Sequence, residues 1–219
     1  MHLYSPRRAN GTQSSGRDSL MKLRYLASVV VLALTTVAAS AQSAQGNVSL
    51  YLNPIAIRAS NTPADSGPYA FLGQNATSNV FYGYNLGGSY DFYHSGSLAA
   101  GADIRLSDLH ANNAMLRNFL FGPRVSVQPF KRPIKPYAEF TFGRGTTKAP
   151  DATVKITKLD YAIYGGVDYS LSRHVDWRVF EVGYGTLVTV STATVGAGGP
   201  FPTNPATLIH FSAGLVFRF

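Results

Sequence analysis

The segment Ile209–Phe219 alternates between apolar residues and small or polar residues over nearly its whole length. A period of two places successive side chains on opposite faces, which is the pattern of a β-strand whose faces meet different environments. A tilted strand of about eleven residues is long enough to cross the hydrocarbon layer of a bilayer. The segment therefore predicts a membrane-spanning strand. Its apolar row consists of Ile209, Phe211, Ala213, Leu215, Phe217 and Phe219.

Seven further segments show the same alternation, and stretches rich in turn-forming residues separate them. An even number of strands lets an antiparallel sheet close, so that every backbone hydrogen-bonding group in lipid finds a partner. We therefore predict an all-β fold, an eight-stranded antiparallel up-and-down transmembrane β-barrel. The predicted strands are about Asn47–Ile57, Val80–Tyr93, Leu98–Ser107, Met115–Val127, Tyr137–Arg144, Lys158–Leu171, Trp177–Val190 and Ile209–Phe219.

The connections between these strands are expected to alternate in length. Short turns follow the second, fourth and sixth strands, at His94–Ser97, Pro129–Pro136 and Ser172–Asp176, as in outer-membrane barrels with short periplasmic turns. Pro54 cannot donate to a strand ladder, so we expect it near a strand end or at a bulge. The longer, external connections are predicted at Arg58–Asn79, Asp108–Ala114, Gly145–Lys155 and Ser191–Pro205.

The segment Met21–Ala41 has the features of a secretory signal peptide. A short basic stretch at Met21–Arg24 precedes an apolar run of about thirteen residues, and Ala39–Ala41 supplies a small-x-small cleavage site. The apolar run is too short for a membrane-spanning helix. Residues 1–20 are then an upstream extension before the true initiator Met21, or else an unusually long first part of the signal. We expect residues 42–219 to form the barrel.

Composition narrows the class of protein further. Five of the 19 basic residues and one of the 11 acidic residues precede position 42, so the predicted mature part carries fourteen basic and ten acidic residues. These charges are scattered rather than clustered, and we predict no nucleic-acid partner. The absence of cysteine excludes a disulfide framework, a thiolate metal site and lipidation at an N-terminal cysteine. Thirteen Tyr, thirteen Phe and 21 Gly suit an all-β membrane wall.

The two rows of each strand predict two different solvents. Leu, Ile, Val, Ala, Phe and Tyr dominate the row that would face lipid, and most ionisable residues lie in the other row. Carboxylates and guanidiniums buried at this density must pair with one another. Eight strands enclose a lumen just wide enough for side chains to fill, so we predict a salt-bridged lumen, with a small or gated channel as the alternative. The predicted lumen charge network is Asp103, Arg105, Arg124, Glu139, Asp160, Asp168, Glu181 and Arg218.

Aromatic residues also mark one edge of the predicted wall. They lie in the lipid-facing row beside the short turns or at the chain end, which is the position of a periplasmic aromatic girdle. These residues are Tyr90, Phe92, Tyr169, Phe217 and Phe219.

Two stretches carry a family resemblance that covers Asn47–Phe219. The segment Gly165–Gly185 (GGVDYSLSRHVDWRVFEVGYG) and the C-terminal LVFRF, taken with the turn pattern, resemble the OmpA/OmpX-like eight-stranded outer-membrane β-barrel family. The resemblance implies export to the outer membrane of a Gram-negative bacterium and contact with its lipid and lipopolysaccharide. It also implies that Leu215, Phe217 and Phe219 are the signal that the barrel-assembly machinery reads. The function expected is structural or surface interaction, and the external loops are either the surface that meets an external ligand or simple solvated connections.

Other functions have weaker support in the sequence. A lipid A-modifying enzyme would need a nucleophile and a base, and the single candidate, His210 with Ser212, falls in the lumen row, away from the acyl chains. A secreted lipocalin-like binder would reverse the rows, with Leu and Phe inside and charges outside. Histidines His94, His110 and His174 are expected in separate connections without metal-ligand spacing. We therefore predict no enzyme activity, no metal and no cofactor.

Overall fold

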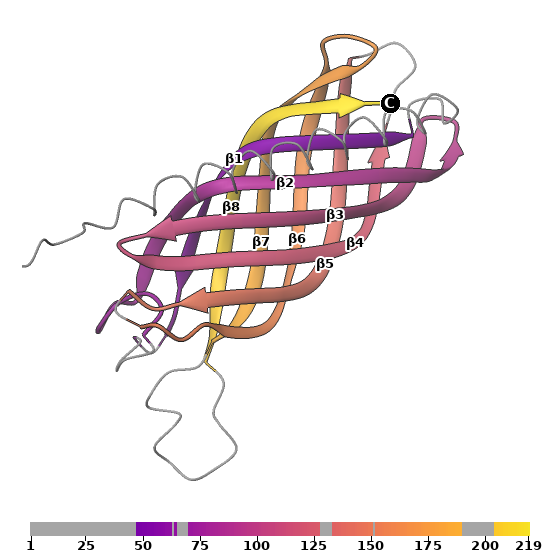
Figure 1. The fold of residues 1–219 in the computed structure, drawn as a ribbon. Helices are drawn as coiled ribbons and strands as arrows, with labels where there is room; N and C mark the ends of the chain where they lie inside the picture. The colour runs from indigo at the N-terminus through magenta and orange to yellow at the C-terminus, as the bar shows by residue number, and fades with distance from the viewer. Residues whose placement is uncertain (1–46, 63, 65–69, 128–132, 151, 190–203) are drawn as a thin grey trace, which may run out of the picture. The chain divides into compact units, whose positions relative to one another are not determined.

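The computed structural model describes residues 47–62, 64, 70–127, 133–150, 152–189 and 204–219. Each strand pairs antiparallel with its neighbours in the chain, and β1 pairs with β8 to close a barrel (Figure 1). The predicted fold class, an eight-stranded closed antiparallel barrel, is confirmed. The predicted extension and signal peptide lie outside the described residues. The strands are β1 (Val48–Ser60), β2 (Ser78–Ser95), β3 (Leu98–Ala111), β4 (Ala114–Val127), β5 (Ile134–Lys148), β6 (Ile156–Ser170), β7 (Val175–Thr189) and β8 (Asn204–Arg218).

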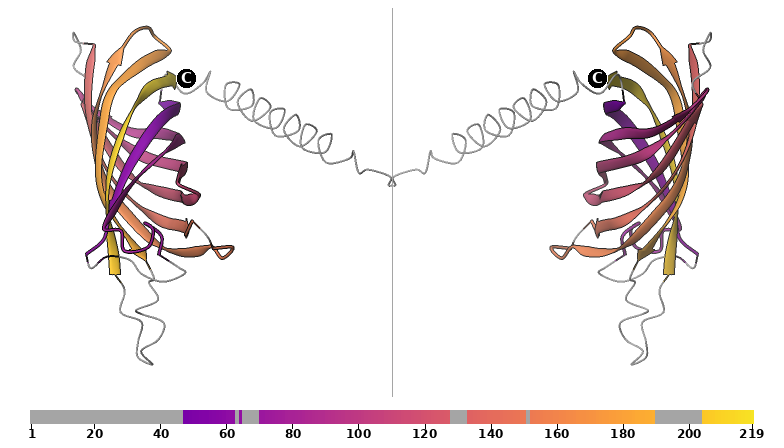
Figure 2. Two further views of the ribbon diagram at one scale, coloured as in Figure 1. Left: turned by 90° about the vertical axis from the view of Figure 1, so that its left-hand side faces the viewer. Right: turned by 90° about the vertical axis from the view of Figure 1, so that its right-hand side faces the viewer.

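The barrel has two rims, which we name by their connections. The C-terminal rim holds the end of β8 and the strand ends that residues 96–97, 128–133 and 171–174 join. The loop rim holds the strand ends that residues 61–77, 112–113, 149–155 and 190–203 join. In Figure 1 the strands β1 to β4 on one side of the barrel cross β6 to β8 on the other side at a steep angle. Figure 2 shows the same barrel from two further sides. No helix in the described part of the chain is long and apolar enough to span a membrane.

The connection between β3 and β4 is much shorter than predicted. Both strands run to a two-residue turn at Asn112 and Asn113, whose φ angles are 45° and 65°. Positive φ at both central residues is the requirement of a tight hairpin turn, and asparagine tolerates that conformation well. The predicted loop Asp108–Ala114 is therefore wrong. His94 and His110 lie within β2 and β3 rather than in connections.

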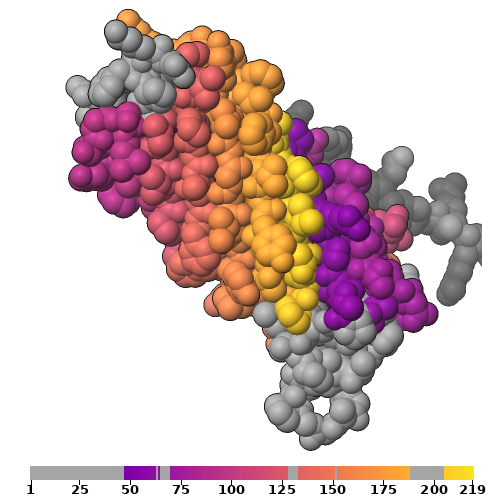
Figure 3. All heavy atoms as spheres, turned by 180° about the vertical axis from the view of Figure 1, so that it is seen from behind, coloured from indigo at the N-terminus to yellow at the C-terminus, as the bar shows by residue number. Residues whose placement is uncertain are grey.

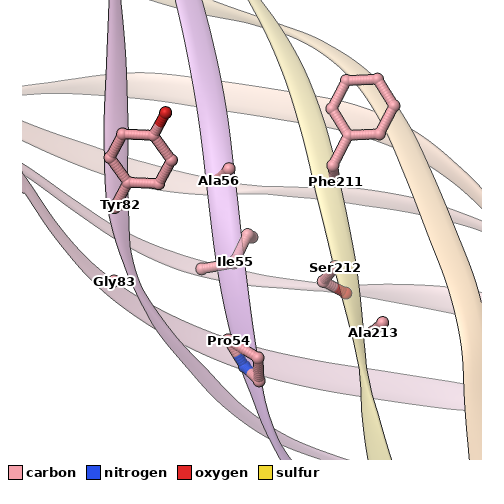
Figure 4. A pocket seen from close by; sticks show the side chains of 8 residues that line it. All are labelled: Pro54, Ile55, Ala56, Tyr82, Gly83, Phe211, Ser212 and Ala213. Atoms are coloured by element: carbon pink, nitrogen blue, oxygen red, sulfur yellow. The ribbon is translucent and has the colours of Figure 1, made fainter.

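Pro54 lies in the middle of β1, not at an end or a bulge as predicted. The β1–β8 pairing joins Leu52 to Leu215 and Ile55 to Ser212 without a register shift, and the ladder is interrupted between these pairs. The proline's missing N–H is thus accommodated on the β8 side, while pairing with β2 continues at Tyr84. A surface groove of about 410 Å³ lies over this seam. Figure 4 shows its lining side chains, with Tyr82 on one side and Phe211 on the other.

The two predicted rows face the two sides of the wall. The outward row exposes large apolar side chains, such as Tyr84 at 67% and Phe92 at 65%. Figure 3 shows one side of this wall, where yellow β8 lies between orange β7 and indigo β1. The ionisable residues of the predicted lumen row are buried, apart from Arg218, which is half-buried at the C-terminal rim.

The lumen has an apolar half that was not predicted. Near the loop rim a cluster of inward side chains is apolar, and Phe71 and Leu72 of the β1–β2 connection are buried in it. The rings of Phe71 and Phe81 stack with centroids 4.8 Å apart. Part of the predicted external connection Arg58–Asn79 therefore lies inside the barrel. This loop-rim core consists of Ile55, Ile57, Ala59, Phe71, Leu72, Phe81, Leu109, Ala114, Leu116, Leu187 and Leu208.

Candidate functional site

Below the loop-rim core, three arginines and four carboxylates join into one group inside the barrel. We call this group the lumen network. All its side chains are buried, and its members come from β3, β4, β5, β6 and β7. It consists of Arg105, Arg124, Arg178, Asp103, Glu139, Asp168 and Glu181.

Arg105 makes more ion pairs than any other member of the lumen network. Its Nη2 lies 2.9 Å from Glu139 Oε2, and its Nη1 lies 3.2 Å from Glu181 Oε1. Its Nε donates to Asp103 Oδ1 at 3.4 Å, and its guanidinium lies 3.9 Å from the ring centroid of Tyr164. Three carboxylates therefore share one cation in a region of low dielectric, where each contact is strong and an unpaired charge is costly.

Arg178 and Arg124 share a second carboxylate. Arg178 donates to Asp168 through Nε at 2.9 Å and through Nη2 at 3.3 Å, a two-pronged arrangement. Its Nη1 lies 3.1 Å from Glu181 Oε2. Arg124 Nη2 donates to Asp168 at 3.1 Å. Glu181 thus links the Arg105 half of the network to the Asp168 half, and the whole group behaves as one unit.

Three inward tyrosines provide flat surfaces for the guanidiniums. Each tyrosine sits directly opposite a glycine of the next strand, and a Cβ on that glycine would come within 2.5 Å of the tyrosine ring or hydroxyl. The missing side chain is therefore what lets each ring occupy its place. An arginine lies 3.9 to 4.6 Å from each ring centroid, a cation–π distance. The pairs are Tyr51 with Gly87, Tyr137 with Gly166 and Tyr164 with Gly183.

The tyrosine hydroxyls tie the network to further strands. Tyr51 of β1 donates to Asp103 at 2.8 Å, and Tyr137 of β5 donates to Glu181 at 2.6 Å. Ser212 of β8 donates to the other oxygen of Glu181 at 2.9 Å. Polar contacts therefore cross the lumen to β1 and β8, the two strands that close the barrel.

A smaller polar group lies at the C-terminal rim. Lys135 Nζ is 2.9 Å from Asp176 Oδ2, and Arg218 Nη1 is 3.7 Å from the same oxygen. These residues and Arg124 border a space of about 20 Å³. A volume of that size holds roughly one water molecule. The space between the rim group and Arg124 is therefore no larger than a water molecule.

The structure brings together six of the eight predicted network residues. Arg218 belongs to the rim group instead, and Asp160 stands apart from the others. Arg178 was missed because strict alternation from Glu181 places it outward. Both neighbours of β7 shift register between Arg178 and Glu181, which leaves Val179 as an extra residue and turns Arg178 inward. The signal was present in the sequence, because Val179 and Phe180 are two consecutive apolar residues in an alternating strand.

Asp160 is fully buried, and neither of its carboxylate oxygens has a hydrogen-bond partner among the described residues. Burying a carboxylate without a partner is unfavourable. We expect Asp160→Asn to stabilise the barrel by about 1–3 kcal/mol. The measurement is the free energy of unfolding in urea and lipid vesicles at pH 9. Asp168→Asn on the same strand is the matched control and should destabilise, because it removes an anion that two arginines bind. A loss of stability in both variants would contradict the account of Asp160.

The candidate catalytic pair is inward, as predicted, but its members bind other groups. Ser212 donates to Glu181, whereas His210 Nδ1 lies 3.2 Å from the Tyr164 hydroxyl. Both residues are buried in the lumen, away from the outward surface where acyl chains would lie. Within the residues that the structure describes, no group of three or more His, Cys, Asp or Glu side chains could hold a metal ion.

Comparisons with known proteins give distant structural neighbours. No protein-family model matches the chain, and no curated protein matches it. Neisserial surface protein A is 15% identical with a TM-score of 0.49, covering 79% of this chain and 97% of its own. Ail of Yersinia pestis is 9% identical with a TM-score of 0.45 (80% and 99% covered), and OprG of Pseudomonas aeruginosa is 10% identical with a TM-score of 0.43 (80% and 97% covered). At these values residue roles do not transfer, and the fold assignment rests on the strand pairing of this chain.

Proposed function

We propose that the protein is an integral outer-membrane protein whose closed barrel has a structural or surface-interaction role and carries out no catalysis. The observation that carries this proposal is the distribution of polarity, with an apolar outer wall around a charged lumen. A soluble protein does not expose a continuous wall of Phe, Tyr, Leu and Ile, whereas a barrel in lipid requires one. A lipocalin-like binder would need the opposite distribution.

The rims give the orientation. Short turns are typical of the periplasmic side of outer-membrane barrels and longer loops of the external side, so the C-terminal rim is assigned to the periplasm. Outward aromatics at that rim support the assignment, since Tyr90, Phe92, Tyr169, Phe217 and Trp177 are between 38% and 65% exposed. Leu215 and Phe217 also point outward there, available to the barrel-assembly machinery. A ligand from outside the cell would meet the loop rim.

The closed lumen is the basis for preferring a structural role to a channel. The loop-rim core and the lumen network form two successive layers of buried side chains, one apolar and one charged. An ion would have to displace buried side chains in both layers, and the lumen network is held by buried ion pairs that involve at least five strands. A small or gated channel would need both layers to rearrange together.

We therefore expect the refolded protein to give no steady conductance in planar bilayers. Arg124→Ala and Glu139→Ala should leave the traces unchanged, because the loop-rim core still closes the other half of the lumen. A heat-modifiability gel of the same preparation checks that the barrel is folded, and a blue shift in the fluorescence of Trp177, the single tryptophan, checks insertion into lipid. Conductance steps that change in either variant would instead support the channel.

A further inference from the structure

The outward row carries its charges at one rim only. Among the strand residues that the structure describes, it has no Lys, Arg, Asp or Glu in the half near the C-terminal rim, where its large side chains are apolar. At the loop rim the same row carries four basic residues and one acidic residue. Because a lipid bilayer presents headgroups at both surfaces, a need for polarity alone would not confine the charges of the outward row to the loop-rim ends of the strands. These outward residues are Arg58, Arg117, Arg144, Lys148 and Asp108.

Three of the four basic residues gather on two neighbouring strands. Arg117 of β4 pairs directly with Thr146 of β5, so Arg144 and Lys148 are its diagonal neighbours on the same face. Diagonal neighbours in an antiparallel pair lie about 7–8 Å apart, within reach of arginine and lysine side chains. Asp108 binds Arg117 and holds it in place. In the part of the chain that the structure describes, no ion pair engages Arg144 or Lys148.

An apolar surface continues directly from this basic group toward the middle of the wall. Phe119 pairs with Arg144, and Phe121 pairs with Phe142 one step further from the rim. The rings of Phe121 and Phe142 lie 4.3 Å apart, and those of Phe140 and Phe142 lie 6.3 Å apart. These four phenylalanines are 40% to 45% exposed. Cationic groups above an aromatic surface match a molecule with an anionic head and hydrocarbon tails.

We propose that Arg117, Arg144 and Lys148 bind the phosphate groups of a phosphorylated glycolipid of the lipid A type, with its acyl chains on the phenylalanines of β4 and β5. This inference rests on the proposed outer-membrane location and names the lipid that the loop rim selects. Guanidinium groups bind phosphate through paired hydrogen bonds, and lysine adds a mobile point charge. Arg58 lies alone on β1, between Val80 and Ile209, and is not part of the site.

The test compares lipid binding by two charge-matched double variants. Native mass spectrometry of the refolded full chain measures occupancy by bisphosphorylated lipid A, by lipid A lacking its phosphates and by phosphatidylglycerol. Arg144→Gln with Lys148→Gln should weaken binding of bisphosphorylated lipid A about 30-fold, the effect of two basic residues at a membrane surface. Arg58→Gln with Arg173→Gln removes the same charge elsewhere and should leave binding unchanged. Arg173 is exposed in the β6–β7 turn.

Two further results would overturn the site. Equal occupancy by phosphatidylglycerol or by dephosphorylated lipid A would mean that the surface does not select phosphorylated glycolipid, and equal losses in both double variants would mean a general charge effect. Arg144→Lys with Lys148→Arg keeps both charges and should keep binding if the site is built from them. Trp177 fluorescence separates the two proposals, because a wild-type protein that inserts but does not bind lipid A disproves only this site. Failure to insert would disprove the membrane location itself.

Discussion

Replacing Arg105 by methionine is expected to destabilise the barrel by about 3–5 kcal/mol, the cost of removing one partner from a buried ion pair. The substitution keeps much of the side-chain volume but leaves Glu139, Glu181 and Asp103 without their shared cation. Ser212 and Tyr137 still donate to Glu181, whereas Glu139 keeps no other ion pair within the described residues. The measurement is urea-induced unfolding in lipid vesicles, followed by the fluorescence of Trp177.

Two companion variants make this result specific. Arg144→Met removes an outward arginine and should change stability by less than about 1 kcal/mol, as expected for an exposed charge. Adding Glu139→Gln to Arg105→Met should recover part of the loss, because it removes the charge that the first change left unpaired. If Arg105→Met and Arg144→Met destabilised the barrel equally, the lumen network would not be what holds the strands together.

The wall of this barrel could be predicted from the sequence because alternation is a local property. Each strand's rows follow from residue order alone, and Asp103 and Arg105 fall inward for the same reason as Leu106 falls outward. The prediction fails where the period breaks. A single extra residue, Val179, reverses the phase of β7 and turns Arg178 inward. A strict alternation counted along β7 from Glu181 could not predict that reversal.

The contacts inside the lumen depend on register, which the sequence does not display. Tyr51, Tyr137 and Tyr164 fall in the predicted lumen row, but their pairing with glycines follows from which residues of two strands stand side by side. Asp160 also shows that a residue's row does not predict its contacts. It shares the row and the charge of the network carboxylates, yet the strand register places it beside Leu187 rather than an arginine. A row predicts which residues face the lumen, and only register determines which of them meet.

The two layers of the lumen have different origins. The charged layer is built from strand residues, so most of it could be predicted. The apolar layer is completed by Phe71 and Leu72, which belong to the connection Arg58–Asn79, predicted to lie outside the barrel wall as an external loop. Loop segments carry no periodic signal, and nothing in the sequence around Phe71 indicates that it returns to stack on Phe81. The strand pattern alone therefore does not predict that side chains block the lumen near the loop rim.

Two adjacent glycines on β6 offer the sharpest test of the tyrosine–glycine pairs. A Cβ at Gly166 would lie 2.5 Å from the Tyr137 hydroxyl oxygen and 2.6 Å from its Cζ, whereas a Cβ at Gly165 would meet only a backbone oxygen of Tyr137 at 3.9 Å. The Tyr137 ring cannot move freely, since Glu181 holds its hydroxyl and Arg124 lies 4.0 Å from its centroid. Gly166→Ala should therefore destabilise the barrel by about 1–3 kcal/mol, the cost of overpacking a filled interior.

Gly165→Ala is the matched control, and its effect should be close to zero or slightly stabilising, because alanine loses less conformational freedom on folding than glycine. Both variants are measured by urea unfolding in the same vesicles. In a Tyr137→Leu background, Gly166→Ala should lose most of its cost, since the ring that it displaces is gone. Equal losses of stability in Gly166→Ala and Gly165→Ala, or an unchanged cost of Gly166→Ala in the Tyr137→Leu background, would contradict this. Gly166 would then be needed by the strand backbone and not to make room for the Tyr137 ring. The stacked arginines would then have to be positioned by the carboxylates alone.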